Sequence, residues 1–191
     1  MGTASFSTEP QEFILGDAAQ VGTLYLPEGD GWYPALVLVL DAAGPSEVEP
    51  YAAAALGQGY AVLTFEAADG ALAPTTLAAA DSLLMRPDIR PELIGLLGLG
   101  EGAWAAAFAG ARAPETAFVV LLPGDSAPPP ASLERLADLH CPVLAFVPDE
   151  AAAALLTQHL GHNPEVTIHT GPGSGTDFFA VLGPWLQRQA S

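Results

Sequence analysis

Residues 94–104 read IGLLGLGEGAW, and this stretch decides the expected fold of the chain. Its first residues are almost all apolar, which is typical of a strand that is buried on both faces of a sheet. Gly98, Gly100 and Gly102 then alternate with other residues, and a run of small residues follows. The stretch therefore predicts a buried strand that enters a tight, glycine-rich turn and continues at once into a helix.

The segments on both sides of this stretch alternate between strand and helix patterns. Expected strands cover 13–15, 21–26, 35–40, 61–65, 94–99, 117–122, 142–147 and 166–169, and expected helices cover 46–56, 76–85, 101–111, 133–139, 151–160 and 178–189. Alternation at this spacing predicts a mostly parallel, doubly wound sheet with helices on both faces, a three-layer α/β/α sandwich. No linker or internal repeat divides the chain, so we expect one domain over residues 1–191.

The charge balance excludes two classes of partner. The chain of 191 residues has 22 acidic and 5 basic residues, and its formal net charge is −17. All five bases are arginines that stand apart in the sequence, and lysine is absent. Nucleic acids and anionic membrane surfaces both need clustered cations, so we expect the protein to bind neither.

The sequence shows no feature of an exported or membrane protein. Its first dozen residues lack the basic and apolar regions of a secretory signal, and no apolar run approaches the roughly 18 residues that span a bilayer. Cys141 is the single cysteine, which excludes an intrachain disulfide and a multi-cysteine metal site. We therefore expect a cytoplasmic protein without a cofactor or metal.

Six segments of the chain, taken in order, resemble a known family. The 94–104 stretch resembles the nucleophile elbow G-x-S-x-G, with Gly98 and Gly102 as its flanking glycines. The other segments are LVLVLDAAGPS, QGYAVLTFE, RPDIRPELIGLLG, HCPVLAFVPDE and VTIHTGPGSGTDFF. Together they are similar to the dienelactone hydrolase family and its small, lidless esterase relatives within the α/β-hydrolase superfamily. The resemblance implies a minimal α/β-hydrolase fold without a lid domain.

The same resemblance places the catalytic positions on residues that cannot do the chemistry. A covalent hydrolase of this kind needs a Ser or Cys nucleophile, a His base and an Asp that orients the base. Aligned with the family pattern, Gly100 takes the nucleophile position, Thr176 that of the histidine and Ala151 that of the acid. The sequence thus predicts a natural pseudo-hydrolase with a binding or regulatory role.

An active ester or lactone hydrolase with a non-standard site is the alternative function. The residues that such a site could use instead are Asp149, Glu150 and Ser174, together with Thr176. Asp149 and Glu150 are one or two residues from the expected acid position, so a shift in register would bring either of them there.

Ligands of parallel sheets bind beyond the carboxyl ends of the strands, and this rule selects the candidate binding residues. They are Asp41, Ala42, Ala43, Glu66, Gly100, Glu101 and Asp177. The N–H groups of Glu101 and of Ala42 or Ala43 could form an oxyanion-like pocket. The acidic side chains could attract a cationic ligand or simply be solvated. A small molecule or a protein partner is expected, bound to a monomer or a homodimer.

A minor alternative is a dinucleotide-binding Rossmann protein. Gly98, Gly100 and Ala103 satisfy the pattern G-x-G-x-x-A between a strand and a helix, and Asp125 follows 25 residues after Gly100. The pattern normally follows the first strand of the domain, whereas here about four strands precede it.

Overall fold

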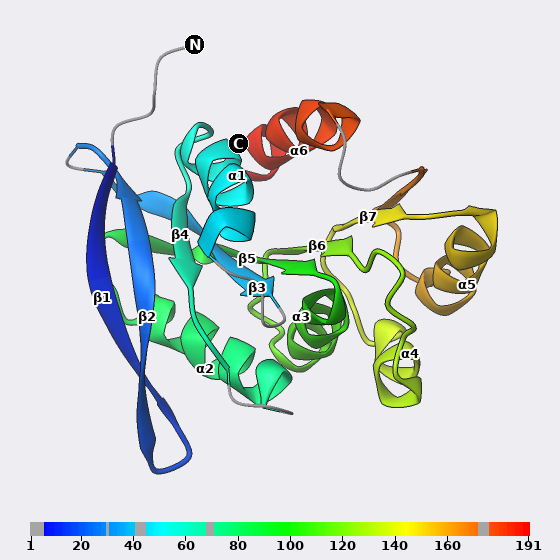
Figure 1. Ribbon diagram of the computed structural model, residues 1–191, viewed down its shortest axis with the longest axis horizontal. Coiled ribbons are helices and arrows are strands. Elements are labelled where there is room, and N and C mark those ends of the chain that lie inside the picture. The colour runs from blue at the N-terminus through cyan, green and yellow to red at the C-terminus, as the bar shows by residue number, and fades with distance from the viewer. Residues whose placement is uncertain (1–5, 30, 41–44, 68–70, 172–175) are drawn as a thin grey trace.

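A single mixed sheet of eight strands forms the middle of the protein (Figure 1). The computed structural model describes residues 6–29, 31–40, 45–67, 71–171 and 176–191. The strands are β1 (Phe6–Leu15), β2 (Ala18–Pro27), β3 (Tyr33–Leu40), β4 (Ala61–Thr64), β5 (Ile89–Leu99), β6 (Phe118–Leu122), β7 (Val143–Val147) and β8 (Val166–Thr170). Their spatial order is β1-β2-β4-β3-β5-β6-β7-β8. Strand β2 runs antiparallel to both of its neighbours, and all other pairs are parallel.

Helices cover both faces of this sheet, which makes the three layers that the sequence predicts. They are α1 (Pro45–Leu56), α2 (Leu72–Leu84), α3 (Glu101–Arg112), α4 (Pro130–Leu136), α5 (Glu150–Leu160) and α6 (Thr176–Gln189). Helices α1 and α6 lie on one face and the other four on the opposite face (Figure 1). The longest, α6, has 14 residues, and within the described ranges no helix is long and apolar enough to cross a membrane.

The strand β3 shows how one sequence fills two cores. Leu36 and Leu38 point into the core under α1 and α6, whereas Val37 and Val39 point into the core under α2 and α3. Successive side chains of a strand face opposite sides of the sheet, so a strand buried on both sides must be apolar throughout. The predicted fold class is confirmed, and so is the type of every predicted helix and strand.

Several elements begin earlier than predicted, and the largest difference is in β1, which begins at Phe6 rather than 13. Strand β5 begins at Ile89 rather than 94, and helix α2 begins at Leu72 rather than 76. Arg90, Pro91 and Glu92 interrupt the apolar pattern of β5, and the added segment pairs with β3 only through Tyr33 and Ile89, across a register shift. Pro74 stands in the first turn of α2, where backbone N–H groups make no hydrogen bond within the helix, so a residue without an N–H is tolerated there.

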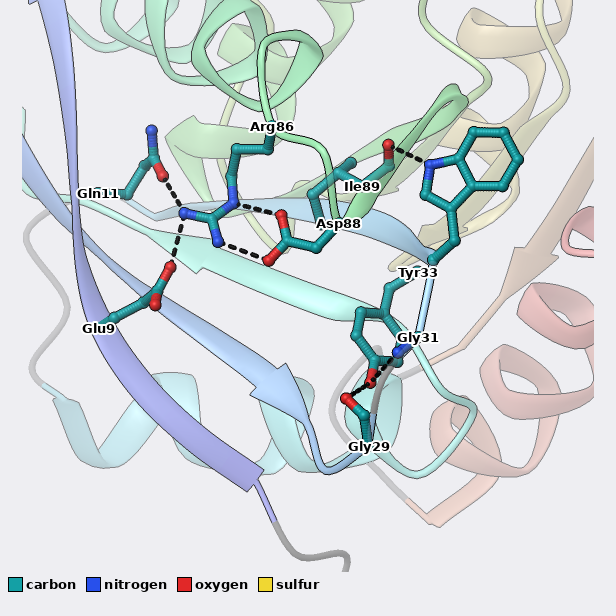
Figure 2. A network of polar contacts seen from close by, with 9 residues as sticks. Glu9, Gln11, Gly29, Gly31, Tyr33, Arg86, Asp88 and Ile89 are labelled. Carbon is teal, nitrogen blue, oxygen red and sulfur yellow. Dashed lines mark hydrogen bonds and ion pairs between the residues drawn. The ribbon is translucent and has the colours of Figure 1, made fainter.

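One arginine adds a network of polar contacts between strand β1 and the segment that follows α2 (Figure 2). Arg86 follows α2 and donates through Nε and Nη2 to the two carboxylate oxygens of Asp88, at 2.8 and 2.6 Å. Its Nη1 lies 2.6 Å from Glu9 Oε1 and donates to Gln11 Oε1 at 2.9 Å, both on β1. The hydrogen bonds from Arg86 hold the pKa of Asp88 below its usual range.

Candidate functional site

The turn between β5 and α3 has the backbone of a nucleophile elbow. Strand β5 ends at Leu99, helix α3 begins at Glu101, and Gly100 between them has φ 57° and ψ −127°. L-residues rarely adopt this conformation, and glycine adopts it without steric cost. The N–H of Gly100 donates to the carbonyl of Leu122 at the end of β6, at 2.8 Å, which fixes the turn against the sheet. The predicted strand–turn–helix unit is confirmed.

The two flanking glycines are required by close packing. A Cβ atom added at Gly98 would overlap the backbone of Gly102 and Ala103, and one added at Gly102 would overlap the carbonyl of Val39. Helix α3 therefore lies directly on strands β5 and β3, and no side chain can separate them. This contact sets the direction of α3 and so the position of its amino end.

At the centre of the elbow there is no side chain to react. Gly100 supplies only backbone atoms, and the side chain of Glu101, the next residue, is exposed. The N–H groups in the first turn of a helix have no partner within the helix, and they lie at the positive end of its dipole. The N–H groups of the turn can therefore donate hydrogen bonds to a ligand, although the turn has no side chain that could attack the ligand.

The segment after β7 holds the carboxylates that the family pattern places near the acid position. Asp149 caps α5, since its Oδ1 accepts the N–H of Ala152 at 2.8 Å. Glu150 Oε1 accepts a hydrogen bond from Thr170 Oγ1 at 3.0 Å, and this bond joins α5 to the end of β8. Ala151, the residue expected to replace the acid, is exposed. Both neighbouring carboxylates thus have partners within the protein.

Strand β8 also carries a histidine whose contacts the sequence analysis missed. The ring of His169 stacks on Phe146 of β7, with centroids 4.9 Å apart and an angle of 15° between the planes. Phe178 of α6 meets the same Phe146 edge-on at 4.7 Å. His169 and Thr170 are consecutive in a strand, so their side chains point to opposite faces of the sheet. The imidazole is thus separated by the sheet from the Glu150–Thr170 hydrogen bond.

The structure describes some of the other predicted site residues and not the rest. Glu66 is exposed just beyond β4, at the same carboxyl-terminal edge of the sheet as Gly100 and Asp149. Thr176 and Asp177 begin α6. Asp41, Ala42, Ala43 and Ser174 lie outside the described residues. Within the described part of the chain, no three His, Cys, Asp or Glu residues gather as a metal site would require.

The thiol of Cys141 is not a substitute nucleophile. It lies half-buried before β7, at the opposite edge of the sheet from the elbow, and burial raises its pKa to about 11. A cysteine needs its thiolate form to attack, and at neutral pH this thiol stays protonated.

The Rossmann alternative does not match the observed strand order. A dinucleotide-binding sheet has the order 3-2-1-4-5-6 and carries its glycine pattern after the first strand. Here the pattern follows the fifth strand of a sheet ordered β1-β2-β4-β3-β5-β6-β7-β8. Asp125 is exposed in the loop after β6, and the carbonyl of its neighbour Ser126 accepts the indole N–H of Trp104 at 3.2 Å. The Rossmann prediction is therefore wrong for the fold.

Comparisons with known proteins identify the fold. No family model matches the sequence, and no curated protein matches it either. Among solved structures, an esterase from Pyrococcus furiosus is similar with a TM-score of 0.79 at 14% identity, over 98% of this chain and 92% of that one. A dienelactone hydrolase from Anabaena variabilis is similar with a TM-score of 0.74 at 19% identity, over 98% of this chain and 97% of the other. A cold-adapted esterase from an Arctic intertidal metagenomic library matches over 100% of this chain and 97% of its own, with a TM-score of 0.77 at 16% identity. The protein has the α/β-hydrolase fold.

Proposed function

We propose that this α/β-hydrolase-fold protein is a non-catalytic relative of the dienelactone hydrolase type, a cytoplasmic pseudo-hydrolase that binds a small molecule or a protein partner. The observation that carries the proposal is Gly100, which occupies the centre of an intact elbow without a side chain. Covalent ester hydrolysis on this fold begins with attack by a side chain at that position. The backbone geometry is present and the attacking group is absent.

The conformational free energy of the residue at the centre of the elbow agrees with a protein that no longer catalyses a reaction. A non-glycine residue held at the φ and ψ of Gly100 costs about 1–3 kcal/mol, which an active enzyme accepts for the sake of its nucleophile. Glycine removes that cost. Thr176 cannot act as a base near neutral pH, and Asp149, which stands near the acid position, caps a helix. The residues at the three expected catalytic positions, Gly100, Thr176 and Ala151, therefore support a site that no longer hydrolyses esters.

Binding is the property that this arrangement supports best. The backbone N–H groups at the start of α3 remain available to a ligand, and Glu101 and Glu66 bring negative charge to the same edge of the sheet. Asp41, Ala42, Ala43 and Asp177 complete the proposed binding set. We propose that the protein binds its ligand or partner as a monomer or a homodimer.

One observation favours the second candidate, an active hydrolase with a non-standard site. Glu150 Oε1 and Thr170 Oγ1 are 3.0 Å apart, within the distance at which a carboxylate can take a proton from a hydroxyl nucleophile. Thr170 would attack the ester carbonyl while Glu150 accepts its proton; the C–O bond to the alcohol would then break, the alcohol would leave with that proton, and water would hydrolyse the threonyl ester. Asp149, Ser174 and Thr176 are further candidates. No imidazole lies in that pair, so the base would be a weak one.

Hydrolysis of p-nitrophenyl esters separates the two candidates. We expect the wild type to hydrolyse these esters no faster than buffer alone does. The rate should be the same in Glu150→Gln and in Thr170→Val. Glu134→Gln is the matched control, because Glu134 is an exposed acid on α4. Turnover that either site variant abolishes and the control retains would overturn the pseudo-hydrolase proposal.

A gain-of-function variant tests the elbow directly. In Gly100→Ser with Thr176→His, we expect ester turnover to rise above the wild-type rate, because the serine would stand on an elbow backbone that is already formed. A folded double variant that stays at the buffer rate would show that the substitutions at Gly100 and Thr176 are not what prevents turnover.

A further inference from the structure

One side of the β1–β2 hairpin is left uncovered by the residues that the structure describes. Residues that pair directly across two antiparallel strands point to the same side of the sheet. The even-numbered residues from 6 to 14 therefore share one side with their partners, the odd-numbered residues from 19 to 27. We call this side the outer hairpin face, and its residues are exposed except for the half-buried Tyr25 and Pro27. The opposite side carries Phe13 and Leu24, which are buried in the core under α2.

Large apolar side chains are exposed at both ends of the outer hairpin face. Phe6 is 47% exposed and packs on Tyr25, with ring centroids 5.8 Å apart. Ile14 and Val21 are 64% and 61% exposed and stand diagonally across the two strands, where side chains are neighbours. Helices α1 and α6 lie on the same side of the sheet, but no helix lies over the tip of the hairpin (Figure 1). Apolar side chains gathered on one exposed face indicate an interaction surface.

The free edge of β1 is protected against an added strand by Pro10. Pro10 pairs with Thr23, whose carbonyl accepts the hydroxyl of Thr64 on β4 at 3.4 Å and so points away from β1. Pairs of antiparallel residues direct their backbone groups either toward each other or both outward, so the backbone of Pro10 faces the free edge. Proline has no N–H to offer there, and proline on an edge strand hinders the addition of another strand. A partner is therefore expected to cover the face and not to extend the edge.

The charges around the outer hairpin face select the chemistry of the partner. Glu12 is the one charged residue on the face, and Asp17 and Glu28 flank it at the two ends of β2. None of the five arginines lies on β1 or β2. A second copy that met this face through a two-fold axis would bring the same carboxylates together, with no base to pair with them. A partner with bases beside an apolar stripe matches the face, and the net charge of −17 attracts it.

We propose that the outer hairpin face binds a basic amphipathic helix of another protein. A strand rises about 3.3 Å per residue, so the apolar side chains from Phe6 to Ile14 span roughly 26 Å. A helix of about 18 residues has that length. Helices also cover the same side of the sheet elsewhere, since α1 and α6 pack there. The hairpin strands take no part in the elbow, so this surface is separate from the proposed pseudo-hydrolase site.

The test is a titration of the ¹⁵N-labelled protein with a peptide of about 18 leucine and lysine residues, in which the leucines follow the helical period. We expect the peptide to shift the amides of 6–15 and 18–27. Ile14→Thr with Val21→Thr should weaken binding at least about tenfold, because apolar contacts are lost while the net charge stays the same. Met85→Gln is the control, since Met85 is an apolar side chain that is 86% exposed outside the hairpin, and it should weaken binding less than about twofold.

A second peptide separates recognition of the face from general attraction to an acidic protein. It has the same composition with its leucines out of helical order, and we expect it to bind at least about tenfold more weakly. Equal binding of the two peptides, equal effects of the site and control variants, or absence of shifts in the hairpin would overturn the proposal. So would an oligomer that dissociates in Ile14→Thr with Val21→Thr on sedimentation, because a second copy would then cover the face.

Discussion

The two edges of the sheet differ in what holds them together. At the carboxyl-terminal edge, close backbone contacts fix the elbow: Gly98 lies on Gly102, Gly102 lies on Val39, and the N–H of Gly100 donates to the carbonyl of Leu122. At the amino-terminal edge, the guanidinium of Arg86 bonds to three side chains, two on β1 and one in the turn before β5 (Figure 2). The elbow thus keeps its shape without a side chain at its centre. Close backbone packing is therefore enough to hold this turn.

The largest effect is expected where the packing of the elbow is broken. Gly98→Ala forces a Cβ into the backbone of α3, which cannot move without leaving β5 and β3, so the free energy of unfolding should fall by about 3 kcal/mol or more. Urea denaturation measures it. Gly161→Ala is the control, because Gly161 is exposed with φ −61°, and it should stay within about 0.5 kcal/mol. Equal effects of the two would mean that the elbow is not packed as described.

A smaller effect is expected from strain at the centre of the same turn. Gly100→Ala leaves the packing of the flanking glycines unchanged and forces a residue with a Cβ to φ 57°, so we expect a loss of about 2 kcal/mol in urea denaturation. Gly124→Ala is the matched control, since Gly124 has the same φ in an exposed turn with no atom within 4 Å. A similar loss in both would assign the cost to φ alone, whereas no loss at Gly100 would contradict a strained elbow.

The smallest effect is expected at the opposite edge, where side chains act. Arg86→Met should lower the free energy of unfolding by about 1 kcal/mol, because a half-buried, forked network is lost. Arg135→Met, which removes an exposed pair with Asp138, should cost less than about 0.5 kcal/mol. Equal losses would mean that the Arg86 network is no stronger than an exposed pair.

The same variant has a defined pH dependence. Arg86 lowers the pKa of Asp88 in the folded protein, so this pair stabilises the fold above the usual pKa range of a carboxyl group. The stabilisation is lost as the pH falls through the lowered pKa. The difference between wild type and Arg86→Met should therefore be constant near pH 7 and shrink below about pH 4. A difference that grows in acid would contradict the assigned bonds.

The pattern of apolar residues in the sequence predicted the fold, because most strands are buried on both faces and therefore consist of continuous apolar runs. It failed locally where polar residues extend a strand, as Arg90 and Glu92 do in β5. The turn around Gly100 was predictable for a different reason, since alternating glycines mark a close approach of backbones. The bond between Glu150 and Thr170 could not be predicted, because it joins exposed side chains 20 residues apart.

The predicted ligand-binding residues stay predictions, since three of them, Asp41, Ala42 and Ala43, lie outside the described residues.

The long hairpin has a consequence for how the molecule opens. Strands β1 and β2 pair along ten residues each, but β2 joins β4 only through Thr23, Leu24 and Tyr25. Beyond those three pairs, Phe13, Leu24 and Leu26 pack in the core near α2, Tyr25 packs against the core under α1 and α6, and Arg86 bonds to β1. Units with few attachments open with less free energy than the whole protein requires. We therefore expect the backbone amides of the hairpin to exchange with solvent at a lower free energy of opening than those of the parallel strands that hold the elbow.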